Sequence, residues 1–169
     1  MSAAGEQGPA AGWPSVPGER DPLTGLPFVD EHRVPVAADA ARVWRTLTEV
    51  VGRKRGGRSE AYARLVRAEP ATASGPPLEL GSTLPGMRVV ESVPGVRAVL
   101  TGRHFLSRYT LLVALEPDPD GPGTVLVAGT YAVFPGPLGF VYRLLVIESG
   151  AHTKAVRGLL ARVRERAER

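Results

Sequence analysis

The rest of this chain is arranged around one stretch, LGFVYRLLVIESGAHTKAVRGLLARVRERA, which runs from Leu138 to Ala167. Pro137 precedes it and favours a helix start, because proline fixes φ near its helical value. At about 100° per residue the apolar and small polar residues share one face: Leu138, Val141, Tyr142, Leu145, Ser149, His152, Val156, Leu159, Leu160 and Val163. At about 1.5 Å per residue the pattern predicts one helix roughly 45 Å long, which needs a broad apolar partner.

The segments before this helix predict that partner. Six stretches read as strands: Leu26–Val36, Leu78–Leu84, Met87–Val93, Val96–Phe105, Ser107–Glu116 and Thr124–Phe134. The last of them is apolar on both faces, so alternation does not decide which way Tyr131 points. Helical spacing in 37–51, with Asp39 as its cap and Trp44 in the core, and in 59–68 predicts a helix pair. Short connections favour antiparallel pairing, so we predict an α+β fold in which a curved antiparallel sheet wraps around the C-terminal helix.

Composition limits the class of protein. The chain has 169 residues, enough for one domain with a full core. Residues 1–25 are rich in Gly, Pro and Ala without periodicity, which predicts a disordered tail that contains Trp13, followed by one domain over 26–169. With no cysteine there is no disulfide or cysteine-ligated metal, which fits a reducing cytoplasm. No secretory signal or membrane-spanning run is evident, so we expect a cytoplasmic protein without a membrane span.

The order of these elements resembles the START-like, or helix-grip, superfamily (SRPBCC proteins). The resemblance covers residues 26–168 and rests on VPVAADAARVWRTL (34–47), LELGST (78–83), the late strand pair, and FPG (134–136) before the final helix. It implies a cavity between the sheet and the helix. Members include lipid and hormone binders and polyketide cyclases and aromatases, but they share no catalytic set, so the resemblance transfers no residue role.

Alternation predicts which polar side chains face that cavity. His104 shares the apolar face of 96–105, and Tyr109 shares that of the next strand, with Ser107 at its mouth. The full set of predicted ligand-binding residues is Glu91, His104, Ser107, Tyr109, Tyr131, Tyr142, Ser149 and His152. Among them His104, His152 and Tyr109 are candidates for acid–base catalysis, because imidazole and phenol groups transfer protons. His32, in a polar edge-like strand, is predicted to be plain surface.

Three functions remain open at this point. We expect binding of a small, mainly apolar molecule in the cavity. The alternatives are an enzyme of the polyketide cyclase or aromatase kind and a protein-interaction module, since the apolar run 144–147 could support a homodimer. Histidines open to a cavity would favour the enzyme, and histidines tied to backbone would favour the binder. The spacing of the histidines does not fit a metal site, and the sequence has no glycine-rich motif of the kind that binds a cofactor. The arginines are scattered, so we expect no nucleic-acid partner.

Overall fold

The computed structural model describes residues 18–53 and 57–169, which form a six-stranded antiparallel sheet in the order β1-β6-β5-β4-β3-β2. The strands are β1 (Phe28–Val36), β2 (Thr83–Leu84), β3 (Met87–Val93), β4 (Arg97–His104), β5 (Ser107–Pro117) and β6 (Thr124–Val133). Strands β2 to β6 follow one another as a meander, and β1 closes the far edge against β6. The predicted α+β architecture is confirmed.

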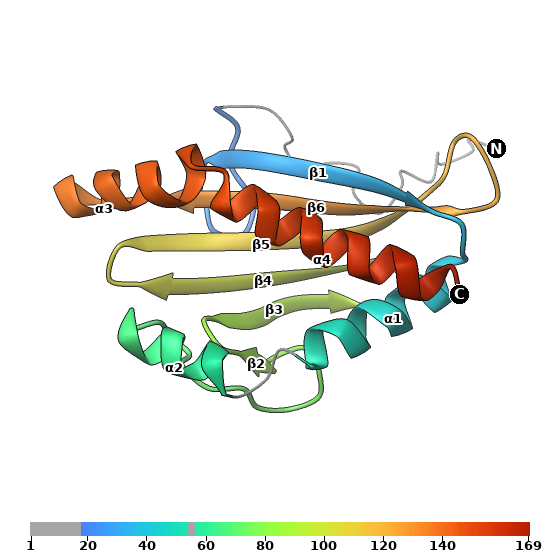
Figure 1. Ribbon diagram of the computed structural model, residues 1–169, viewed down its shortest axis with the longest axis horizontal. Coiled ribbons are helices and arrows are strands. Elements are labelled where there is room, and N and C mark those ends of the chain that lie inside the picture. The colour runs from blue at the N-terminus through green and yellow to red at the C-terminus, as the bar shows by residue number, and fades with distance from the viewer. Residues whose placement is uncertain (1–17, 54–56) are drawn as a thin grey trace, which may run out of the picture.

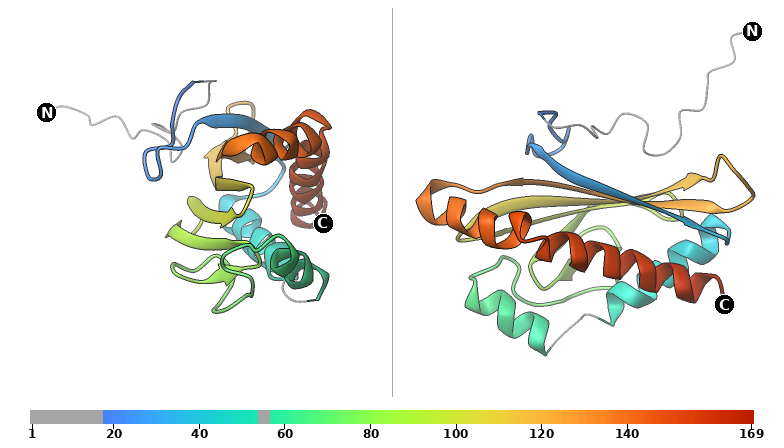
Figure 2. Two further views of the ribbon diagram at one scale, coloured as in Figure 1. Left: turned by 90° about the vertical axis from the view of Figure 1, so that its left-hand side faces the viewer. Right: turned by 45° about the horizontal axis from the view of Figure 1, so that its top comes forward.

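The helices are α1 (Ala40–Gly52), α2 (Arg58–Leu65), α3 (Gly136–Arg143), the π-helical η1 (Leu144–Glu148) and α4 (Ala151–Ala167). They lie on one side of the curved sheet, with α3 to α4 running across it and α1 and α2 near the β2 edge (Figure 1). The end-on view of Figure 2 shows the segment before β1 on the other side. We call the helix-covered side the inner face and the other the outer face. No helix of the described residues is long and apolar enough to cross a membrane.

The core has one cluster on each face of the sheet. On the inner face α1 and α4 bury their apolar sides, including Leu47 and Leu160, against alternate residues of β3 to β6, such as Val89. The cap of α1 is Asp39, whose carboxylate accepts a hydrogen bond from the backbone N–H of Arg42 at 2.8 Å. On the outer face a smaller cluster forms around Tyr131. Strands β4 to β6 are therefore covered on both sides over much of their length.

The C-terminal helix is not the single continuous helix that its periodicity predicts. Gly150 has φ +74°, a left-handed conformation that favours glycine, and it separates η1 from α4. The break divides the predicted apolar face in two. Beyond it Val156, Leu160 and Val163 are buried, whereas before it Leu138, Val141 and Leu145 are 69%, 50% and 65% exposed. The expectation that this whole face packs on the sheet is correct only for α4.

Two β-bulges change which face the side chains take. In β1 the register shifts between Phe28 and Asp30, so Phe28 pairs with Tyr131 on the outer face while Asp30 pairs with Thr130 on the inner face. In β3 the register shifts between Val89 and Glu91. A bulge adds one residue to one strand, and because side chains alternate, each later residue moves to the opposite face.

The segment before β1 forms a turn on the outer face. Asp21 is buried there, and its carboxylate accepts hydrogen bonds from the backbone N–H groups of Leu23 and Thr24 at 2.9 and 2.6 Å. The Thr24 hydroxyl lies 3.0 Å from the hydroxyl of Thr110 on β5. The sequence-predicted tail overlaps this turn at residues 18–25; its remainder, with Trp13, lies outside the described residues. The predicted strand 78–84 is reduced to β2, since Leu78 adopts φ +61°.

Candidate functional site

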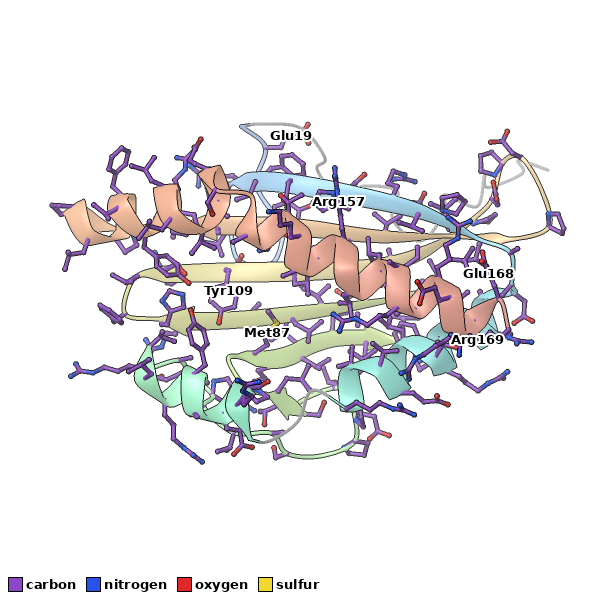
Figure 3. All side chains as sticks on the ribbon, in the orientation of Figure 1. Glu19, Met87, Tyr109, Arg157, Glu168 and Arg169 are labelled. Atoms are coloured by element: carbon purple, nitrogen blue, oxygen red, sulfur yellow. The ribbon has the colours of Figure 1, made fainter. Side chains whose placement is uncertain are left out.

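A cavity of about 530 Å3 lies between the inner face of the sheet and the helices. Its walls come from α2, from the ends of β4, β5 and β6, and from the segment α3 to α4. Most of the lining is apolar: Ala63, Val66, Ala68, Met87, Leu111, Ala132, Phe134, Val146, Ile147, Ala155, Val156 and Leu159. Figure 3 shows Tyr109 and Met87 on the sheet between α2 and the C-terminal helices. Such a cavity suits a small molecule that is itself mainly apolar.

His104 is fixed by two hydrogen bonds at the end of β4. The backbone N–H of Leu106 donates to Nδ1 at 3.1 Å, and Nε2 lies 2.9 Å from the hydroxyl of Ser107. Because Nδ1 accepts a hydrogen bond, the neutral ring carries its proton on Nε2 and donates it to Ser107. Burial lowers the pKa of His104 below its ordinary value of 6.5. His104 is therefore a neutral donor with both ring nitrogens engaged, and neither is free to take a proton from a ligand.

Tyr109 on β5 is held where β4 and the turn between β2 and β3 come very close together. Its hydroxyl donates to the carbonyl of Gly86 at 2.7 Å, and burial raises the pKa of Tyr109 to about 12. The phenol ring lies over Gly102, its partner on β4. A Cβ at that position would stand 1.9 Å from the Gly86 carbonyl oxygen and 2.7 Å from the Tyr109 ring. Gly102 therefore makes room for the bond that fixes Tyr109.

Tyr142 brings the start of the C-terminal helices into the same group. Its ring meets His104 edge-on at 4.9 Å between centroids and lies 6.3 Å from the ring of Phe134. Burial, together with the hydroxyl of Tyr62 on α2, raises the pKa of Tyr142. Gly139 allows α3 to sit close here, since a Cβ would stand 2.7 Å from the Phe134 carbonyl carbon. One end of the cavity is thus aromatic and hydroxyl-rich.

A second polar group lies where α4 crosses β1 and β6. Nε2 of His152 lies 3.0 Å from the hydroxyl of Thr130 and 3.6 Å from Oδ1 of Asp30, which is an ion-pair distance but not a hydrogen bond. Oδ2 of Asp30 lies 3.2 Å from Nε2 of His32. Oδ1 is buried and has no hydrogen-bond partner among the described residues. Burial raises the pKa of Asp30, but His152, Thr130 and His32 outweigh it, so this pKa lies below its ordinary value of 3.8.

The structure places five of the eight sequence-predicted site residues in the cavity wall: His104, Ser107, Tyr109, Tyr142 and His152. The other three lie elsewhere. The bulge in β3 carries Glu91 to the outer face, opposite Val99, where it pairs with Arg97. Tyr131 is buried on the outer face, 5.8 Å from the ring of Phe28. Ser149, beside the helix break, is exposed and donates to the Leu145 carbonyl.

Sequence reasoning missed several polar residues of the site. Tyr62 and Thr130 line the cavity, and Asp30 and His32 stand behind His152. The prediction that His32 is plain surface is wrong, because its side chain is only 11% exposed and pairs with Asp30. The available signal was the alternation that puts Asp30 and His32 on one face with Val34. No cluster of three or more His, Asp or Glu in the described part of the chain is arranged to hold a metal ion.

Comparison with known proteins gives no family and no curated relative: the sequence matches neither any family profile nor any curated protein. Solved structures do match the fold. The Aha1 dimer from Colwellia psychrerythraea has a TM-score of 0.51 at 15% identity over 82% of this chain and 94% of that one. A conserved protein from Geobacillus kaustophilus has a TM-score of 0.50 at 13% identity over 81% and 93%. CalU16 from Micromonospora echinospora has a TM-score of 0.48 at 15% identity over 82% of each chain. At these identities the likeness concerns the fold alone, and that fold is the helix-grip fold.

Proposed function

We propose that this protein, as a START-like protein, binds a small, mainly apolar molecule in the cavity between the sheet and the C-terminal helices. The observation that carries the proposal is the cavity itself, about 530 Å3 of mostly aliphatic and aromatic wall. Two polar groups, one around Tyr142 and one at His152, lie on this wall and can orient a ligand by hydrogen bonds. Binding accounts best for His104 and Tyr109, because both are tied to backbone groups.

Native mass spectrometry of the freshly purified full chain tests this proposal directly. We expect a retained small molecule, or saturable binding of the dye 1-anilinonaphthalene-8-sulfonate that apolar compounds displace. Ala155→Phe should weaken binding, because Ala155 lines the cavity and a phenyl ring there can occupy part of it. Ala161→Phe is the matched control, since Ala161 lies on the same helix and is exposed like Ala155 but is not part of the cavity wall. Equal binding by the two variants would refute the cavity site.

A second function, proton transfer on a carbonyl compound in the manner of a cyclase or aromatase, is favoured by one observation. His152 lines the cavity, and its Nε2 faces Thr130 and Asp30. Its Nδ1 makes no hydrogen bond to a described residue. A carboxylate beside one imidazole nitrogen can orient the ring so that the other nitrogen meets the substrate. Of the predicted catalytic candidates, His152 suits this role better than His104 or Tyr109.

Deuterium exchange separates the enzyme from the binder. If His152 is a base, the protein should speed exchange at the central carbon of 1-phenyl-1,3-butanedione in D2O, followed by proton NMR. His152→Gln should remove the acceleration while the dye still binds. If the wild-type protein binds the diketone without accelerating exchange, the enzyme function is excluded and the binding function is retained.

We also propose that two copies associate through the exposed apolar side of α3 and η1. Leu138, Phe140, Val141, Leu144 and Leu145 are all 43% exposed or more. Phe105, in the neighbouring β4–β5 turn, is 58% exposed. The helix-grip protein from Colwellia is described as a dimer, which supports assembly of copies as the use of this surface.

A further inference from the structure

The outer face of the sheet, away from the helices, carries a hollow. It measures about 760 Å3 and is bounded by the turn before β1 and by Glu69 and Pro70. Its floor comes from β3, β4 and β5. Four arginines line it, namely Arg20 from the turn, Arg88 from β3, Arg103 from β4 and Arg108 from β5. All four are exposed to solvent, so a dissolved molecule can reach them.

The charges in this hollow are not balanced. Arg103 pairs with Glu69: its Nε and Nη2 both donate to the same carboxylate oxygen, at 3.0 and 2.5 Å. Arg20 and Arg88 donate to the backbone carbonyls of Gly25 and Gly81, which carry no net charge. Arg108 makes no hydrogen bond or ion pair with any described residue. Four guanidinium groups and one carboxylate line the hollow, which therefore has a formal charge of +3.

The sheet register concentrates this charge. Arg103 and Arg108 are direct cross-strand partners, and Arg88 follows on the next strand opposite Thr101. Like charges in directly opposed positions destabilise a sheet. Some exposed arginines elsewhere in the fold pair with carboxylates: Arg33 pairs with Glu31 and Glu116, and Arg164 pairs with Glu168. In the hollow only Arg103 has a carboxylate partner among the described residues, and an anion from solution would balance the charges of Arg20, Arg88 and Arg108.

We propose that this outer hollow is a binding site for a phosphate-bearing small molecule. A guanidinium group offers a planar fork of donors that matches two oxygens of a phosphate group. A phosphate monoester carries about −1.5 to −2 charges near neutral pH, so it balances more positive charge than one carboxylate does. The formal charge and the volume fit a ligand with one or two phosphate groups. Arg108, Arg88 and Arg20 are the residues that bind it.

Calorimetric titration of the full chain with sodium pyrophosphate at low ionic strength tests the site. We expect saturable binding that weakens as salt is added. Arg108→Gln and Arg88→Gln should each weaken binding by about tenfold or more, as loss of a charge-assisted hydrogen bond does. Arg157→Gln removes the same charge from α4, outside the hollow, and should change affinity by less than about twofold. Thermal melts of each variant confirm that it is folded.

Two results would overturn the proposal. One is the absence of saturable pyrophosphate binding by the wild-type protein at millimolar concentration. The other is an equal loss in Arg157→Gln and Arg108→Gln, which would show attraction to the overall positive charge of the protein instead of a site. Because Ala155 lines the ligand cavity and not the hollow, Ala155→Phe should leave pyrophosphate binding intact, so failure of either proposal can be recognised separately.

Phosphatidylcholine vesicles containing phosphatidic acid distinguish the source of the phosphate group. Sedimentation with these vesicles that needs Arg108 and is reversed by pyrophosphate would identify a lipid headgroup as the ligand. Binding of pyrophosphate without sedimentation would identify a soluble phosphate compound. Either result supports the site in the outer hollow.

Discussion

The carboxylate of Asp30 on β1 contacts two histidines, one with each oxygen, and one of them ties β1 to the C-terminal helix. His32 comes from its own strand and His152 from α4. A partly buried carboxylate is unfavourable unless charged or hydrogen-bonding groups surround it, and here the neighbouring groups hold its pKa below 3.8. A group whose pKa falls on folding stabilises the protein above its unfolded pKa, and this contribution is lost as pH falls through the folded pKa.

The first prediction follows from the lowered pKa of Asp30. Asp30→Asn should lower the free energy of unfolding at pH 7 by about 1–3 kcal/mol, the range for a hydrogen bond or ion pair to a charged group. The difference from wild type should shrink as pH falls below about 4, because the wild-type carboxylate then becomes neutral as well. Urea unfolding between pH 7 and pH 2 measures it. Asp120→Asn, in the exposed β5–β6 loop, is the control and should show no such difference.

The second prediction concerns the proton of His104. Burial lowers the pKa of this ring, and the Leu106 N–H occupies Nδ1, so His104 should remain mostly neutral at pH 6.5 with its proton on Nε2. Stability from this residue is complete above 6.5 and declines as pH falls toward its folded pKa. Long-range 1H–15N NMR spectra of the imidazole rings report both tautomer and titration. A His104 ring that titrates at or above 6.5, or that carries its proton on Nδ1, would contradict this assignment.

At the residue scale the sequence predicted the strand alternation well and failed where alternation is interrupted. His104, Ser107 and Tyr109 reach the cavity because β4 and β5 pair without a bulge. Glu91 does not, since one extra residue in β3 reverses the faces beyond it. The bulge in β1 separates Phe28 from Asp30 in the same way. Neither bulge contains a glycine, so no residue type marks its place in the sequence.

At the scale of elements the break at Gly150 decides what the C-terminal helices do. The periodicity of apolar residues continues through the break, which is why the sequence predicts a single helix. A glycine within a helical pattern is often tolerated, so Gly150 alone did not indicate a break. In the structure η1 lies at the junction, and the π-helical turn brings Val146 and Ile147 to the cavity while Leu145 faces solvent. π-Helical turns commonly occur at functional sites.

The third prediction tests which part of this stretch holds the fold together. Leu160 on α4 is completely buried in the inner core, so Leu160→Ala should cost about 2–5 kcal/mol through lost burial and the cavity left behind. Arg157→Ala, on the exposed surface of the same helix (Figure 3), should stay within about 0.5 kcal/mol. Chemical denaturation of both variants gives the comparison, and comparable losses would mean that α4 does not pack as described.

At the scale of the whole molecule the two faces of one sheet serve different chemistry. The inner face and its helices enclose an apolar cavity, and the outer face carries a hollow lined by arginines. Strands β4 and β5 contribute to both, because alternate residues of one strand point to opposite sides. His104 and Tyr109 point inward while their neighbours Arg103 and Arg108 point outward. The sequence predicted the inner arrangement, whereas the hollow depends on a turn within the segment that the sequence predicts to be a disordered tail.

The last prediction concerns the apolar surface of α3 and η1. Contiguous exposed apolar side chains are unfavourable in water unless a partner covers them, and we propose that a second copy does so. Sedimentation equilibrium of the full chain should show a dimer, and Leu145→Glu should shift it to monomer by placing a charge in the interface. Leu80→Glu changes an equally exposed leucine near β2 and should leave the dimer intact. A wild-type protein that stays monomeric at high micromolar concentration would show that copies of this chain do not cover the surface. Dissociation by Leu80→Glu would place the interface at the β2 edge instead.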